Sequence, residues 1–230
     1  RLFGDLAHDV LAQVLRSLPE TGAIAAARAR VAVDVAVPRR AATLLRPEER
    51  SQLLRSREAI ARAAERVVET LIERGAKVRD VEQDIVLEKD GRTVRGRPDL
   101  VVTDPLVVID SKSGKDAPRR EALEHGAAVQ LVAYAALLRA RDGQWPELAY
   151  FLLRSRRLFT TSAALGGLHA VDPLLTVEQS YQRMKKGIAR ADAELASGWL
   201  SAPGVGARVP LPVVRDGELP VASPCQICAF

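Results

Sequence analysis

The sequence predicts an α/β domain in which a central mixed sheet, built from an antiparallel meander and one parallel strand, is flanked by helices. Three observations predict this class. Apolar residues recur at helical spacing before residue 75, and from residue 77 the pattern changes to short runs rich in β-branched residues. A helical stretch then separates the strand expected at 106–112 from the strand expected at 147–153, and a right-handed crossover makes such strands parallel.

Length and composition limit the class of protein. The chain has 230 residues, of which 47% are hydrophobic, and this excludes a disordered chain. The formal charge of +5 favours a polyanionic partner, although basic proteins that bind no nucleic acid are common. Neither a long apolar run nor a signal-peptide pattern occurs, so we expect a cytoplasmic protein that does not bind membranes.

We expect one domain that is a fragment of a larger protein, because the chain begins at Arg1 and stops just after a cysteine pair. Its expected parts are a helical N-terminal part (1–75), an α/β core (76–160) and a C-terminal helix with a Cys-containing tail (161–230).

The expected elements follow from periodicity and from turn residues. Helices are predicted at 1–17, 21–45, 47–75, 118–141 and 177–197. Strands are predicted at 78–89, 93–102, 106–112 and 147–153, and a loop at 161–174. Asp90-Gly91 is a strong hairpin signal between the first two strands, and Pro38 predicts irregular chain near the end of the second helix.

Two aspartates are expected to face each other on neighbouring strands. Pairing Val102 with Val107 brings Asp99 opposite Asp110, because each aspartate lies three residues outward from that pair. Lys112 then shares the face of Asp110. Like charges that face each other on apolar strands are destabilising, and a divalent cation between the carboxylates removes that cost. The arrangement predicts a metal site.

Three further polar side chains lie on apolar helix faces. His8 points inward from the first helix, where it is either a hydrogen-bonded core histidine or a metal ligand. Gln130 and Tyr134 lie one turn apart in an apolar stripe of the helix that follows Lys112. They are either core residues or groups that support the site.

These residues carry a family resemblance. Pro98-Asp99 followed by Asp110-Ser111-Lys112 resembles the motif of the PD-(D/E)XK nuclease superfamily, and residues 109–114 are similar to its form in RecB-type exonucleases. The resemblance implies a restriction-endonuclease-like core at residues 76–160, with Asp99, Asp110 and Lys112 as catalytic residues. Ser111 departs from the family pattern, which often has an aromatic residue there.

The resemblance also covers residues outside the motif. It implies that a Gly4-x-x-x-His8 helix brings His8 to the metal, and that Gln130-x-x-x-Tyr134 supports the site and contacts the substrate. Glu82 resembles an acidic residue that often opens the meander in this family, with a surface glutamate as the alternative.

The expected cofactor is Mg²⁺ or Mn²⁺, held by Asp99 and Asp110 with the backbone carbonyl of Ser111 as a further ligand. An imidazole from His8 favours tolerance of Mn²⁺, since nitrogen ligands suit transition ions. Lys112 either orients the attacking water and lowers its pKa or compensates the charge of the aspartates.

Arg154 and Arg156 follow the last predicted strand directly. Such a basic run is either solvated surface or a set of groups that hold phosphates of the substrate.

Cys225 and Cys228 form a C-x-x-C pair near the end of the chain. Two cysteines cannot complete a tetrahedral metal site. A similar pair in the AddB-like branch of RecB-type nucleases belongs to a four-cysteine set that holds an iron-sulfur cluster. The resemblance therefore implies a 4Fe-4S cluster in the full-length protein only. Free thiols and a transient zinc site are the alternatives.

We expect a metal-dependent DNA nuclease, an exonuclease module that acts in DNA repair or recombination together with a helicase domain or subunit. The alternative is a nuclease-like module that binds DNA or serves as a scaffold without cutting. An unrelated α/β fold, in which Asp99 is a turn or capping residue, is a third interpretation.

Overall fold

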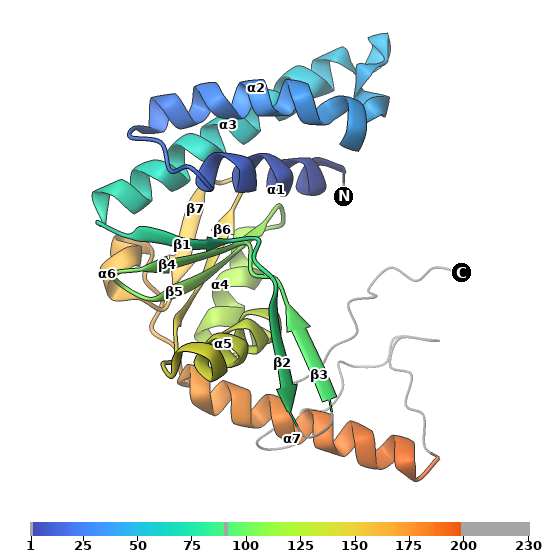
Figure 1. The fold of residues 1–230 in the computed structure, drawn as a ribbon, viewed down its shortest axis with the longest axis vertical. Coiled ribbons are helices and arrows are strands. Elements are labelled where there is room, and N and C mark those ends of the chain that lie inside the picture. The colour runs from blue at the N-terminus through green and yellow to red at the C-terminus, as the bar shows by residue number, and fades with distance from the viewer. Residues whose placement is uncertain (1, 90–91, 199–230) are drawn as a thin grey trace.

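The computed structural model describes residues 2–89 and 92–198, which form a sheet between two helical layers (Figure 1). The main sheet has five strands in the order β1-β4-β5-β6-β7. These are β1 Lys77–Val81, β4 Leu100–Thr103, β5 Val107–Lys112, β6 Glu147–Leu152 and β7 Arg157–Thr160. A second sheet pairs β2 Ile85–Lys89 with β3 Arg92–Gly96. The predicted class, a mixed sheet flanked by helices, is confirmed.

Helices cover both faces of the main sheet (Figure 1). One layer consists of α1 Leu2–Leu15, α2 Gly22–Arg40 and α3 Arg50–Glu73, and the other of α4 Asp116–Glu124, α5 Val129–Asp142 and α7 Val177–Ala196. The short helices are η1 Ala42–Leu45, η2 Pro47–Glu49, α6 Ala163–Gly166 and η3 Gly167–His169. Within the described residues, no helix combines the length and the apolarity needed to cross a bilayer.

Alternation along the central strands divides the apolar interior into two cores. On β5, Val107 and Ile109 pack against the α1–α3 layer, whereas Val108 between them packs against α5. Because this period of two continues to the end of the strand, Asp110 and Lys112 lie on the α5 side, and Ser111 lies on the α1 side.

The predicted register around the acidic pair is confirmed. Val102 pairs with Val107 in the antiparallel β4–β5 ladder, and Leu100 pairs with Ile109. The strand after the crossover is also confirmed, since β6 runs parallel to β5 and Asp110 pairs with Tyr150. Asp99 and Asp110 therefore lie at the same end of neighbouring strands.

The predicted strands at 78–89 and 93–102 are each divided, which is a correction. β1 has a register shift between Val78 and Asp80, and Glu82 has a φ of 50°, so the backbone leaves the main sheet there. Pro98 has no N–H to donate on the returning strand. As a result, β1 pairs with β4, whereas β2 and β3 form a hairpin that projects from the body (Figure 1).

The prediction of one continuous helix at 118–141 is wrong. The segment is two helices, α4 and α5, because Gly126 adopts a φ of 64° and ends the first. The break predicted at Pro38 is also wrong. That proline lies in the last turn of α2, where the N–H of Ala41 still closes the helix on the carbonyl of Val37.

Part of the loop predicted at 161–174 is helical, and β7 was not predicted. β7 has only four residues and follows an arginine-rich turn, so its apolar run is too short to give a strand signal. β7 is a strand because it pairs with β6.

Candidate active site

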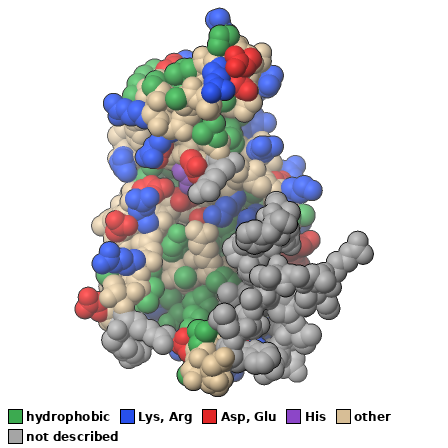
Figure 2. Space-filling model, turned by 90° about the vertical axis from the view of Figure 1, so that its right-hand side faces the viewer, with side chains coloured by type: hydrophobic (Ala, Val, Ile, Leu, Met, Phe, Trp, Pro, Cys, Tyr) green, Lys and Arg blue, Asp and Glu red, His purple; other side chains and the backbone are tan. Residues whose placement is uncertain are grey.

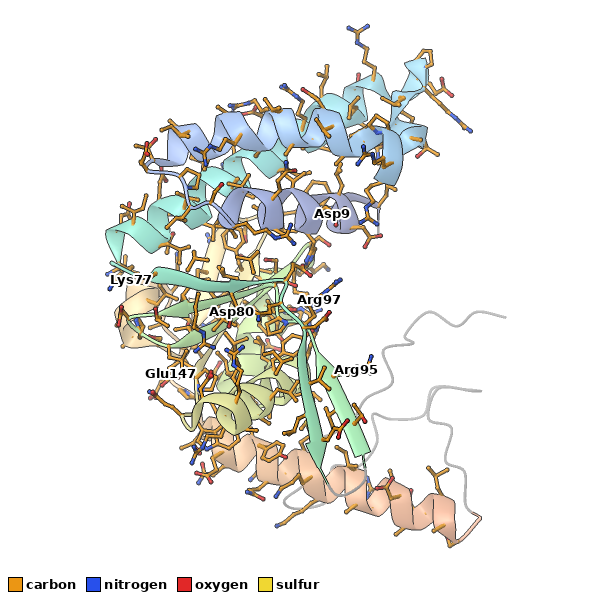
Figure 3. All side chains as sticks on the ribbon, viewed as in Figure 1. Asp9, Lys77, Asp80, Arg95, Arg97 and Glu147 are labelled. Atoms are coloured by element: carbon orange, nitrogen blue, oxygen red, sulfur yellow. The ribbon has the colours of Figure 1, made fainter. Side chains whose placement is uncertain are left out.

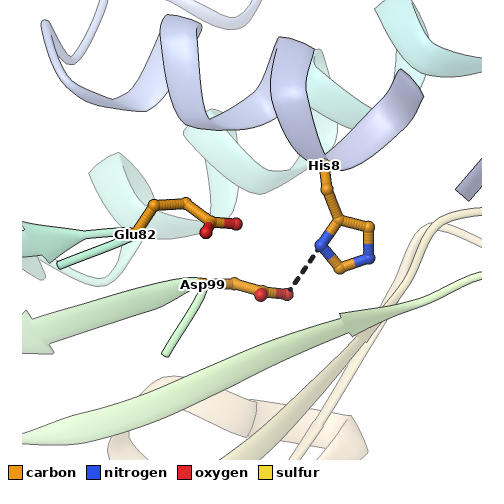
Figure 4. A group of neighbouring side chains, drawn as sticks. All are labelled: His8, Glu82 and Asp99. Atoms are coloured by element: carbon orange, nitrogen blue, oxygen red, sulfur yellow. Dashed lines mark ion pairs between the residues drawn. The ribbon is translucent and has the colours of Figure 1, made fainter. Parts of the chain in front are cut away.

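The candidate site lies at the end of the main sheet where β4 begins and β5 ends. Asp99 immediately precedes β4, Asp110 and Lys112 are in β5, and α1 brings His8 to the same end. The kink after β1 brings Glu82 beside them (Figure 4). Four separate segments of the chain therefore contribute side chains to one place.

Asp99 is held by two contacts. The backbone N–H of Ser111 donates to its Oδ2 at 2.6 Å, and His8 Nδ1 lies 3.1 Å from the same oxygen. The side chain of Asp99 is 17% exposed. The hydrogen bond with Asp99, the largest cause, raises the pKa of His8.

His8, Glu82 and Asp99 each present one donor atom, and these atoms all lie within 4.8 Å of one another (Figure 4). The three residues also line a cavity of about 10 Å³, roughly the space that one water needs. Burial, followed by the charge of Asp99, raises the pKa of Glu82. The geometry favours the site interpretation of Glu82 over a surface glutamate.

Arg97 fixes the carboxylate of Glu82, since its Nε lies 2.9 Å from Glu82 Oε2. Arg97 lies where the β2–β3 hairpin leaves the main sheet, on the same side of the molecule as Asp9 of α1 (Figure 3). The Glu82 backbone N–H donates to the carbonyl of Asp99 at 3.1 Å, which ties the kink to the start of β4.

A chain of contacts connects Asp110 to α5. Lys112 Nζ lies 2.6 Å from Asp110 Oδ2 and donates to Gln130 Oε1 at 2.9 Å. Gln130 Nε2 in turn donates to the hydroxyl of Tyr134 at 2.9 Å. The structure therefore brings Gln130 and Tyr134 to the lysine, as the site interpretation of these residues predicts.

Asp110 is the most buried acid of the site, with 1% of its surface exposed. Burial, and secondly the charge of Asp99, raises the pKa of Asp110 to about 6. Lys112 is its ion-pair partner in the described chain, and among these residues neither of its carboxylate oxygens has a hydrogen-bond partner. A buried carboxylate oxygen without a partner is costly, and such groups are expected to bind an ion or to take part in chemistry.

The donor set fits a hard divalent cation. The converging donor atoms of His8, Glu82 and Asp99 include the carboxylate oxygens that Mg²⁺ and Mn²⁺ prefer and a nitrogen that Mn²⁺ accepts, whereas Asp110 is not among the atoms that lie within 4.8 Å of one another. A positive ion here would also relieve the repulsion that raises the pKa of Asp110.

The family model of the PD-(D/E)XK nuclease superfamily matches residues 1–230, the whole chain. The chain belongs to the PD-(D/E)XK nuclease superfamily. A search of characterised proteins found no match. Membership indicates a nuclease, that is, a hydrolase of phosphodiester bonds, and it agrees with the mixed sheet and with the group of residues suited to a divalent metal.

Two residues of this PD-(D/E)XK chain that were predicted to hold phosphates lie outside the group of carboxylates that forms the candidate site. Arg154 and Arg156 lie in the β6–β7 turn. The guanidinium of Arg154 lies 5.9 Å from the ring centre of Phe3 on α1, and both arginines line a pocket with residues of α3. Cys225 and Cys228 lie outside the described residues.

Sequence reasoning gave Glu82 too little weight and did not single out Arg97. Neither periodicity nor composition marks them, because both depend on the kink after β1, which brings Glu82 back over Asp99. The signal that was present is the Arg97-Pro98-Asp99 sequence, in which an arginine lies two residues before the first acid of the motif.

Proposed function

We propose that the chain is a metal-dependent DNA nuclease in which Asp99 and Asp110 bind one Mg²⁺ or Mn²⁺ ion. The observation that carries the proposal is the buried, unpartnered Oδ1 of Asp110 next to a second carboxylate and a lysine. Because burial and then the charge of Asp99 raise the pKa of Asp110, a cation bound between the two residues would stabilise the ionised form of Asp110.

Further ligands are proposed from three residues. The N–H of Ser111 points to Asp99, and the backbone groups of one residue in a strand point to the same neighbour, so its carbonyl faces the same side. His8 and Glu82 are close enough to Asp99 to complete the set. When bound, the cation stabilises charge on the phosphoryl oxygens and makes a bound water more acidic.

Lys112 is proposed to orient the attacking water. Lys112 Nζ donates to Gln130 Oε1 and lies 2.6 Å from Asp110 Oδ2, and an ammonium group has three N–H donors in all. A further donor is proposed to serve a water or a phosphoryl oxygen. Lys112 is 24% exposed, so substrate can approach it.

Tyr134 and Gln130 are proposed to position this lysine and to contact the substrate. Because Gln130 donates its amide N–H to the hydroxyl of Tyr134, its oxygen faces Lys112. Burial raises the pKa of Tyr134, so the hydroxyl stays protonated and keeps its own hydrogen for a phosphate.

A basic surface surrounds these acids and supports a polyanionic substrate. Figure 2 shows a histidine and acidic side chains near the centre of one face, with lysine and arginine side chains around them. A groove of about 570 Å³ is lined by Arg16, Arg39, Arg40 and Arg97. Two of these arginines pair with acids of the same groove, Arg40 with Asp9 and Arg97 with Glu82. Arg154 and Arg156 are proposed as further phosphate contacts.

The finer function is proposed from the RecB-type resemblance of residues 109–114. We propose an exonuclease that acts in DNA repair or recombination with a helicase domain or subunit. Its Cys225 and Cys228 would bind part of a 4Fe-4S cluster in the full-length protein. The alternative, a module that binds DNA without cutting, has no use for two facing carboxylates and a lysine.

Incubation with end-labelled linear DNA and Mn²⁺ tests the proposal. The wild-type protein should degrade the DNA, and Asp110→Ala should not. A covalently closed circle should resist an exonuclease, whereas cleavage of the circle would indicate an endonuclease. Equal degradation of linear DNA by both proteins would remove Asp110 from the mechanism.

A further inference from the structure

A second basic pocket lies between α3 and the β6–β7 turn. It has a volume of about 300 Å³, and its lining consists of Arg55, Glu58, Ala59, Arg62, Arg154 and Arg156. The α3 members follow the i, i+3, i+4, i+7 spacing of one helix face, so they present a continuous wall. We call these six residues the α3 arginine pocket.

The charge of the α3 arginine pocket is not balanced. Its one acid, Glu58, already accepts hydrogen bonds from Arg62 at 2.9 Å and from two nitrogens of Arg30. These arginines hold the pKa of Glu58 below its usual value, so Glu58 stays ionised. Its negative charge is already compensated by Arg62 and Arg30. Within the described residues, Arg55, Arg154 and Arg156 have no carboxylate partner.

Unpaired guanidinium groups that converge on one concave surface repel one another. Such an arrangement is typical of a site for phosphate, because the guanidinium fork matches phosphate oxygens. The pocket is lined by two elements distant in sequence, α3 and the β6–β7 turn, and this distinguishes it from the solvated face of a single helix.

The pocket lies next to the candidate site without sharing its residues. The N–H of Leu153 donates to the carbonyl of Lys112 at 2.9 Å, and Arg154 follows directly. Arg154 lies over Phe3, and α1 continues from there to His8 within about one and a half turns. Figure 1 shows the upper ends of β6 and β7 behind α1, and the lining of the pocket places their turn against α3.

We propose that the α3 arginine pocket binds a backbone phosphate of the substrate strand at a distance from the bond that is cut. The inference rests on the proposed nuclease function, and it assigns a substrate-binding role to α3, which lies outside the α/β core. A strand long enough to span the pocket and the carboxylates gains this contact, whereas a short strand at the carboxylates does not.

Binding of fluorescein-labelled DNA strands in EDTA, which prevents cleavage, tests the pocket. Arg55→Glu should raise the Kd for a strand of about 20 nucleotides about tenfold, and should leave the Kd for a strand of about 4 nucleotides within about twofold. The dependence of log Kd on log salt should become shallower by about 1 for the long strand. The long strand is also measured annealed to its complement.

Two further variants make the result specific. Arg50→Glu changes the charge of the same helix equally but lies outside the pocket, so it should change the Kd by less than about twofold. Arg154→Ala, from the other wall, should show the same dependence on length as Arg55→Glu. Unchanged melting temperatures exclude misfolding as the cause.

The proposed phosphate site is excluded if Arg55→Glu and Arg50→Glu weaken DNA binding equally. It is also excluded if Arg55→Glu weakens binding of the long and the short strand equally. Failure of the nuclease function is distinguishable, because it would show as absence of cleavage with Mn²⁺ by the wild-type protein. The pattern of binding in EDTA does not depend on cleavage.

Discussion

Replacing Asp110 with asparagine should stabilise the metal-free protein while destroying its metal site. Asparagine has the same shape as aspartate but carries no charge, so the packing between β5 and α5 is kept. The ionised form of Asp110 is penalised by burial and by Asp99, which together raise its pKa to about 6. Removing the charge removes that penalty.

The size of the effect follows from the shift in the Asp110 pKa, from 3.8 to about 6. At about 1.4 kcal/mol per unit, the ionised carboxylate costs the folded state about 3 kcal/mol. This shift already includes the attraction of Lys112, so the loss of that ion pair is not deducted a second time. The expected net gain is about 3 kcal/mol, or about 6–12 °C in melting temperature.

The stability difference between Asp110→Asn and the wild-type protein depends on pH. Because the folded pKa of Asp110 is raised, the stability from its neutral form is fully present below the unfolded pKa of about 3.8 and is lost as pH rises through about 6. Asp110→Asn should therefore be more stable than wild type at about pH 8 in EDTA, and its advantage should disappear at about pH 4.

Urea unfolding at both pH values measures these free energies, with Asp84→Asn as the control. Asp84 is exposed and has no partner within the described residues, so its variant should match wild type at either pH. Added Mn²⁺ should raise the melting temperature of the wild-type protein and of Asp84→Asn, but not of Asp110→Asn. A variant that is less stable than wild type at about pH 8 would show that the buried charge is not a cost, and would refute the reasoning.

Three other variants separate the roles within the site. Lys112→Ala should lower kcat by a factor of about 10²–10⁴. The variant should keep the stabilisation by Mn²⁺, because Lys112 acts on water and not on the ion. Loss of that stabilisation would count against this role. His8→Gln should weaken binding of Mn²⁺ more than binding of Mg²⁺ in calorimetric titrations, because it removes a nitrogen ligand; equal weakening would argue against direct ligation. Tyr134→Phe removes the hydroxyl that Gln130 donates to and should lower kcat about tenfold in the cleavage assay, since Lys112 loses its positioning; full activity would make Tyr134 a core residue.

The sequence was sufficient to predict the acidic pair because the hairpin that carries it is local. Val102 and Val107 are close in the chain, and their pairing then places Asp99 and Asp110 at one end of the sheet. The parallel position of β6 was predictable for a related reason, because the handedness of the crossover leaves one arrangement.

The rest depended on contacts that a sequence pattern does not contain. The kink at Glu82 depends on a positive φ and on pairing between β1 and β4, whose residues are far apart in the chain. The break between α4 and α5 depends on Gly126, where an added Cβ would collide with the side chain of Ser180 on α7. Helical periodicity continues across that glycine, so the pattern alone could not reveal the break.

The position of a bound Mn²⁺ tests the central claim most directly. Crystals grown with Mn²⁺ give an anomalous signal that locates the ion without reference to any assumption about its ligands. We expect one peak bonded to oxygens of both Asp99 and Asp110. A peak that contacts His8, Glu82 and Asp99 but leaves Asp110 bound to Lys112 alone, or no peak at this end of the sheet, would contradict this expectation.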